Sequence, residues 1–161
     1  MNAPDLSSAT SESAGAQQDE SIILASTPCT CHMLRRTARS LTRFYDKALK
    51  PVGLSLSQYS ILANTRHAEC LSITELAERV DLERTTLTRN LAPLVTSGWI
   101  AVGKGADKRR RAVQLTKAGQ ALFQEALPLW QQAESSFRQN MGKEDAKSLR
   151  LLLDEATTAT N

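Results

Sequence analysis

The sequence is poor in the residues that most catalytic and metal-binding sites need. Its 161 residues include two histidines and three cysteines, with two Trp, two Tyr and three Phe as the aromatic side chains. It has no glycine-rich phosphate loop, nucleophile elbow or HExxH motif. Cys31 and His32 are neighbours, and neighbours on a helix diverge by about 100°. We therefore expect neither an enzyme nor a bound cofactor.

Long apolar runs are also missing. No stretch approaches the roughly 18–20 apolar residues that cross a bilayer, and the N-terminal segment lacks the basic-then-apolar pattern of a secretory signal. The three cysteines are too few and too irregular for a disulfide framework. These absences predict a cytoplasmic protein without a membrane partner.

Charge is unevenly distributed along the chain. Residues 1–28 hold four acidic and no basic side chains, a net charge of −4, whereas the whole chain carries +3, so the remainder carries +7. Residues 79–111 hold eight basic and three acidic side chains, a net charge of +5. Such a local excess suits a surface that faces phosphates, although an ordinary solvated face gives the same count.

Helical periodicity covers most of the chain after residue 28. Residues 1–28 are rich in Ser, Ala and acidic side chains, and we expect a disordered tail. Capping boxes begin at Ser55 and Ser72, and Gly98 suits a left-handed helix end. Pro93 and Pro128 predict bends inside their helices. The predicted helices span about 29–50, 55–67, 72–80, 82–97, 117–141 and 143–156.

A change of period separates the fourth and fifth of these helices. Residues 99–102 and 112–115 are short apolar strands, and the loop between them is basic. Two such strands predict a hairpin, the wing. The expected fold is therefore mainly α with a small β-hairpin wing: a winged helix-turn-helix at 55–117, flanked by dimerisation helices at 29–54 and 118–158.

The helix at 82–97 carries short hydrogen-bonding side chains and arginines on one face. Such a helix can enter the major groove, where the base edges are distinguishable, and a basic hairpin can contact phosphates or the minor groove. A winged helix that binds protein instead of DNA is the alternative. The candidate DNA-contacting residues are Ser72, Arg84, Thr85, Thr86, Thr88, Arg89, Asn90, Lys104, Asp107, Lys108, Arg109 and Arg110.

Several motifs in this region resemble the MarR family of transcriptional regulators. They are Leu71–Glu78, Thr85–Arg89, Gly98-Trp99-Ile100, Asp107-Lys108-Arg109 and Leu115-Thr116-Lys117-Ala118-Gly119. The resemblance implies an obligate homodimer that binds a pseudo-palindromic operator as a repressor and is released by a ligand or an oxidant. It also implies that Asp107 braces the wing and that Arg109 enters the minor groove. Pro93 is less usual at its position.

The terminal helices support a dimer independently of the resemblance. Their apolar stripes exceed what a winged helix of about 60 residues can cover. The aromatic residues on these helices are expected to be buried by an intertwined dimer, and a monomeric helical subdomain is the alternative. They are Phe44, Tyr45, Phe123, Trp130 and Phe137.

The segment Cys29-Thr30-Cys31-His32 is the sharpest candidate for a sensor. No second cysteine pair follows, so a metal site is not expected. Similarity to the family's organic-hydroperoxide sensors places Cys31 on their reactive cysteine and Tyr45 on an activating tyrosine, and a position near a helix N-terminus favours the thiolate. However, Arg35 and Leu56 stand where those sensors carry further tyrosines. A small buried residue is the plain alternative for Cys31.

A small-molecule pocket in the same region is the interpretation we prefer. Arg35 or Arg39 would pair with a carboxylate, so the effector would be an aromatic acid or phenol. The alternative is that these arginines face solvent or pair with Asp46 or Glu144. The candidate effector residues are Cys31, His32, Arg35, Arg39, Leu56, Tyr59, Leu62 and Trp130.

Overall fold

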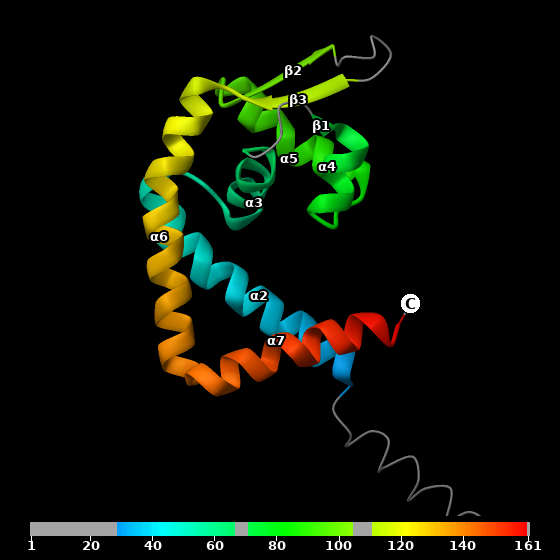
Figure 1. The fold of residues 1–161 in the computed structure, drawn as a ribbon, viewed down its shortest axis with the longest axis vertical. Coiled ribbons are helices and arrows are strands. Elements are labelled where there is room, and N and C mark those ends of the chain that lie inside the picture. Colours follow the sequence, from blue (N-terminus) through cyan, green and yellow to red (C-terminus); the bar gives the residue numbers. More distant parts are fainter. Residues whose placement is uncertain (1–28, 67–70, 105–110, 161) are drawn as a thin grey trace, which may run out of the picture. The chain divides into compact units, whose positions relative to one another are not determined.

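The computed structural model describes residues 29–66, 71–104 and 111–160 (Figure 1). The chain divides into two compact units, 1–41 and 42–161, and each is described by itself. The predicted tail at 1–28 and the loop at 105–110 lie outside the described residues. The elements are α2 (Thr30–Leu49), η1 (Lys50–Val52), α3 (Leu56–Thr65), β1 (Leu71–Ser72), α4 (Ile73–Arg79), α5 (Arg84–Thr96), β2 (Ile100–Lys104), β3 (Arg111–Leu115), α6 (Lys117–Met141) and α7 (Lys143–Thr158).

Both predicted capping boxes are present. The Ser55 hydroxyl accepts the Gln58 N–H at 3.2 Å, and the Gln58 side chain accepts the Ser55 N–H at 2.9 Å. At α4 the Ser72 hydroxyl accepts the Glu75 N–H at 3.1 Å, and Glu75 accepts the Ser72 N–H at 2.8 Å. Each N-cap stabilises its helix by about 1 kcal/mol, so local sequence defines where α3 and α4 begin.

Left-handed residues end the two helices of the helix-turn-helix. Gly98 has φ +72°, as predicted, and the Trp99 N–H donates to the Leu94 carbonyl at 2.9 Å, closing α5 in a Schellman motif. Asp81, at φ +51°, has the same role after α4, where the Leu82 N–H donates to the Ala77 carbonyl at 2.9 Å. This tight turn between α4 and α5 was not predicted, because a left-handed Asp is uncommon.

The wing belongs to a three-stranded antiparallel sheet in the order β1-β3-β2. The expected two-stranded hairpin was therefore incomplete, because β1 pairs with β3 through Leu71 opposite Val113. A strand of two residues carries no alternation to detect, and only pairing with β3 defines it. The hairpin also extends beyond the predicted strands, from Ile100 opposite Leu115 to Lys104 opposite Arg111.

The core of the second unit lies between α3, α4, α5, α6 and the sheet. The apolar spacing of Leu87, Leu91, Leu94 and Val95 predicts that all four share the buried stripe of α5; the first three are buried, but Val95 is 40% exposed, so its predicted burial was wrong. Val95 follows Leu94 by one residue and is rotated by about 100° from it. Both α5 and α6 continue through their exposed prolines, and the bends remain predictions.

In the described part of the chain, none of the helices has the length and apolar content required to cross a membrane.

Candidate nucleic-acid interface

The outer face of α5 is polar and positively charged. Its opposite face is anchored by Leu87 and Leu94, which have no exposed surface. A helix so anchored holds its outer side chains in a defined arrangement. The predicted contact residues on the outer side are Arg84, Thr85, Thr86, Thr88 and Arg89, all exposed, and Asn90, which is half-buried.

The remaining predicted DNA contacts have different positions. Ser72 caps α4, so its hydroxyl already accepts a hydrogen bond, and a DNA contact by Ser72 stays a prediction. Lys104 is the last residue of β2 and pairs with Arg111 of β3. Asp107, Lys108, Arg109 and Arg110 lie outside the described residues, and their roles also stay predictions.

Hydrogen bonds of Thr116 connect the end of α5 and the hairpin to α6. The Thr116 hydroxyl accepts the Gly119 N–H at 3.0 Å and so caps α6. The same hydroxyl lies 2.7 Å from the Gly98 carbonyl oxygen and 3.1 Å from that of Trp99, and the Thr116 N–H donates to Trp99 at 3.1 Å. These additional bonds were not predicted, because they join residues about 17 positions apart.

The predicted effector residues fall into both units. Cys31, His32, Arg35 and Arg39 are exposed on α2 in the first unit, and Leu56, Tyr59, Leu62 and Trp130 belong to the second. Leu62 has no exposed surface and belongs to the core, so it offers no accessible wall in this structure. Asp46, the alternative partner for the arginines, accepts the Leu56 N–H at 2.7 Å.

Aromatic rings form a stacked column in the second unit. The Tyr59 ring lies 5.5 Å from Phe123 and 5.6 Å from Trp130, with interplanar angles of 16° and 18°. The Arg66 guanidinium lies 4.9 Å above the Phe123 ring, a favourable cation–π distance. Burial raises the pKa of Tyr59. The column therefore packs α3 against α6 within one chain.

The sequence predicted that a partner chain buries the aromatic residues of the terminal helices, and this prediction was wrong for two of them. Phe123 and Tyr45 were expected to need a partner chain for burial, but both are buried within the single chain. Trp130 and Phe137 are half-buried, and Phe44 is exposed. Packing between α3 and α6 accounts for Phe123, and only a tertiary structure could reveal it.

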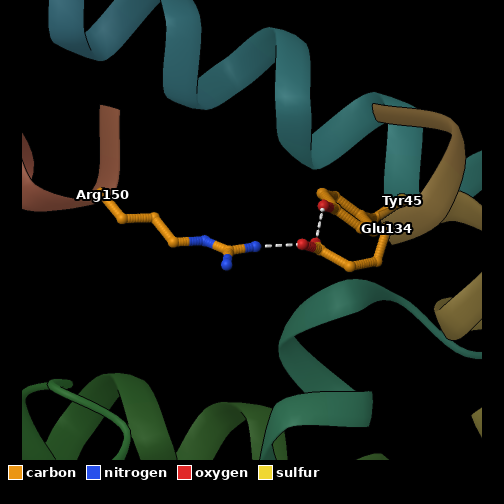
Figure 2. Close-up of polar contacts among 3 residues, drawn as sticks. All are labelled: Tyr45, Glu134 and Arg150. Atoms are coloured by element: carbon orange, nitrogen blue, oxygen red, sulfur yellow. Dashed lines mark hydrogen bonds and ion pairs between the residues drawn. The ribbon is translucent and has the colours of Figure 1, made fainter. Parts of the chain in front are cut away.

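A polar cluster joins the end of α2 to α6 and α7 (Figure 2). The Tyr45 hydroxyl donates to Glu134 Oε2 at 2.6 Å, and Arg150 forms an ion pair with Glu134 Oε1. Burial, followed by the bond to Glu134, raises the pKa of Tyr45 well above its usual value. The Tyr45 proton is therefore retained and directed to Glu134. Glu134 and Arg150 were not anticipated, because nothing in their spacing marks them as partners.

One cavity of the second unit borders this cluster. Its volume is 470 Å³, within the range of small-molecule sites. Glu134 is already paired with Arg150, whereas Arg138 and Lys143 form no ion pair with any of the described side chains. The cavity therefore offers positive charge beside an aromatic ring. Its lining residues are Trp130, Gln131, Glu134, Ser135, Arg138, Gln139 and Lys143.

Within 29–66, 71–104 and 111–160, no three side chains of His, Cys, Asp or Glu are grouped so as to hold a metal ion. Cys29 and Cys31 are exposed free thiols.

Comparison with known proteins identifies the family. The MarR family model matches residues 54–111. The chain is 31% identical over 94 residues to the uncharacterised HTH-type transcriptional regulator YwoH of Bacillus subtilis, covering 58% of this chain and 69% of that protein. It is 28% identical over 113 residues to the multiple antibiotic resistance protein MarR of Escherichia coli, covering 69% and 78% respectively.

This chain is also similar to a solved structure over most of its length. The M. tuberculosis transcriptional regulator MosR, crystallised in complex with DNA, is 36% identical and superposes with a TM-score of 0.70, covering 82% of this chain and 98% of that one. The chain therefore belongs to the MarR family and is a winged-helix DNA-binding transcriptional regulator rather than an enzyme.

Proposed function

We propose that the protein is a cytoplasmic repressor that binds a pseudo-palindromic operator as a homodimer and is released by a small anionic aromatic effector. The observation that carries this proposal is the two-sided character of α5. Its apolar side is buried in the core, and its outer side presents exposed hydroxyl and guanidinium groups. That combination suits major-groove reading. A purely protein-binding winged helix would need neither the arginines nor the basic wing.

Arg89 tests the DNA-reading role of α5. Arg89→Ala should weaken binding to the preferred duplex about 10-fold and relax base preference at one position of each half-site, because a bidentate arginine–guanine contact contributes about 1–3 kcal/mol. Fluorescence anisotropy measures the affinity, and selection from a random duplex library measures the preference. Affinity should fall steeply with salt in the wild-type protein.

Arg43→Ala is the matched control, because Arg43 is an exposed arginine of α2 outside the winged helix. It should bind like the wild-type protein. An unchanged affinity and an unchanged selected sequence for Arg89→Ala would contradict the proposed role, and salt-insensitive binding by the wild-type protein would contradict DNA recognition by the basic surface.

Exposed leucines support the homodimer. On α7, Leu151 is 56% exposed, Leu152 61% and Leu153 40%. In the first unit, Met33 and Leu34 of α2 are also exposed. Apolar patches of this kind mark association surfaces. We assign dimerisation to residues 29–54 and 118–158, and DNA binding to 55–117.

The cavity beside Trp130 supports the effector class. An aromatic acid would place its ring against the indole and its carboxylate near Arg138 and Lys143. On α2, in the first unit, Cys31, His32, Arg35 and Arg39 stay predicted effector residues. The alternative, a thiol sensor that uses Cys31 with Tyr45, is less favoured, because the Tyr45 proton is already donated to Glu134.

A panel of probes distinguishes the two signals. Benzoate, salicylate and 4-hydroxybenzoate are added to the DNA complex, and cumene hydroperoxide is added separately. At least one aromatic acid should release the DNA and raise the melting temperature of the free protein, because a ligand of the folded state stabilises it. Arg138→Gln should lose this response. Cys31→Ser should keep it, because serine retains a hydrogen-bonding group of similar size at residue 31 and removes only the oxidisable sulfur.

Arg43→Gln serves as the control for the loss of a surface arginine. Release by the hydroperoxide that disappears in Cys31→Ser would instead establish the thiol sensor. A response to aromatic acids that is identical in Arg138→Gln would place the effector outside the cavity.

A further inference from the structure

The three threonines at the start of α5 differ in what they can offer to a partner. The Thr88 hydroxyl donates to the Arg84 carbonyl at 2.7 Å, and Thr88 is exposed. The exposed Thr85 and Thr86 have no hydrogen bond from their hydroxyls to any described residue. Thr85 and Thr86 can therefore donate to DNA, whereas the only hydroxyl hydrogen of Thr88 is already in use.

The bond made by Thr88 is local to the helix. It joins a hydroxyl to the carbonyl four residues earlier, a contact that helices make without help from tertiary packing. The bond therefore stays available when α5 contacts another molecule. What Thr88 presents outward is the remaining acceptor capacity of its oxygen and its methyl group.

The major-groove edges of the base pairs differ in how well they match this pair of groups. An A·T pair offers the adenine N6 amino donor and the thymine methyl. The guanine edge offers only acceptors, which a committed hydroxyl cannot satisfy, and cytosine offers an amino group without a methyl. Only A·T supplies partners for both groups of Thr88.

We propose that Thr88 reads an A·T base pair, accepting a hydrogen bond from the adenine amino group and packing its methyl group against the thymine methyl. This inference rests on the proposed DNA-reading role of α5 and adds the base pair that one of its side chains prefers. Thr85 and Thr86, which keep their donors, carry no such restriction.

Base analogues and two matched variants test the two halves of the proposal. The probe is the tightest duplex selected from a random library by the full-length protein. At each A·T pair in turn, thymine is replaced by deoxyuridine, which lacks the methyl, or adenine by purine, which lacks the amino group. At one pair per half-site, each deletion should weaken wild-type binding by about fivefold, the worth of one hydrogen bond or one buried methyl group.

The variants should separate these two losses. Thr88→Val keeps the methyl and lacks the acceptor, so it should remain sensitive to deoxyuridine and become insensitive to purine at that pair. Thr88→Ser keeps the acceptor and lacks the methyl, so it should show the reverse pattern. Thr85→Val, a matched threonine on the same helix face, should retain both wild-type losses at that pair. Circular dichroism and melting temperature check that each variant is folded.

Two negative outcomes are distinguishable. If wild-type binding to DNA depends on salt but Thr88→Val keeps the full purine loss at every A·T pair, the assignment of Thr88 is wrong and the proposed function stands. The assignment of Thr88 would also be wrong if the wild-type protein selected G·C at the base pair whose recognition Thr88→Val changes. If the wild-type protein selects no duplex, both the proposed function and this inference fail.

Discussion

Gly119→Ala is expected to lower the free energy of unfolding by about 3 kcal/mol, the upper part of the usual range for overpacking. A Cβ at residue 119 would overlap the backbone carbonyl oxygen of Trp99 and lie 2.9 Å from Leu115 Cδ1. The Trp99 carbonyl cannot retreat easily, because it accepts the Thr116 N–H at 3.1 Å. Alanine favours helices over glycine by about 1 kcal/mol, and this gain is smaller than the cost of the clash.

Urea denaturation measures this effect, with Gln120→Ala as the control on the same turn of α6. Gln120 is exposed, so its replacement should change stability by less than about 0.5 kcal/mol. The affinity of Gly119→Ala for DNA should also fall, because the substitution disturbs the hydrogen bonds of Thr116 that connect α5 and the hairpin to α6. A variant as stable as the wild-type protein would show that the close approach of Gly119 and Trp99 does not exist.

Leu152→Lys is expected to convert the proposed dimer into a monomer and to weaken binding to the proposed operator by about 100-fold or more. A charged side chain in an apolar interface loses its hydration without a partner, and a monomer loses the gain that comes from binding two linked half-sites. Leu152 is 61% exposed in the single chain. The substitution should therefore leave the helical content of each chain nearly unchanged.

Analytical ultracentrifugation gives the oligomeric state, and anisotropy gives the affinity. The melting temperature of the wild-type protein should rise with protein concentration, whereas that of the variant should not. Asp154→Lys adds a lysine two residues along α7, on the opposite side of the helix from Leu152, and should remain dimeric. A Leu152→Lys protein that is still dimeric at micromolar concentration would exclude this face of α7 from the interface.

Local sequence predicted the features that depend on neighbouring residues. The capping boxes at Ser55 and Ser72 place their side-chain acceptors three residues from the amides that they satisfy, so a short stretch of sequence contains the whole interaction. The same holds for Gly98 and for the period of three and four that marks α5 and α6. The order of these elements was sufficient to indicate a winged helix-turn-helix.

Long-range packing decided what the sequence could not predict. β1 exists only because Leu71 meets Val113, and the Tyr45–Glu134–Arg150 cluster joins residues separated by up to 105 positions. A leucine at residue 62 is compatible with either a pocket wall or the core, and the structure places Leu62 in the core. Sequence periodicity reports which side of a helix is apolar, not which element covers it.

The sequence by itself therefore determined the fold class, the helix boundaries and the polar composition of the outer face of α5, because each depends on residues within about one or two helical turns. The tertiary structure decided how these parts are joined. It buried Leu87 and Leu94 of α5 in the core, connected Gly119 and Thr116 to the Trp99 carbonyl, and stacked Tyr59 against Phe123 and Trp130. The reason is physical: close packing and hydrogen bonding between distant segments depend on three-dimensional proximity, which no local pattern of residues encodes.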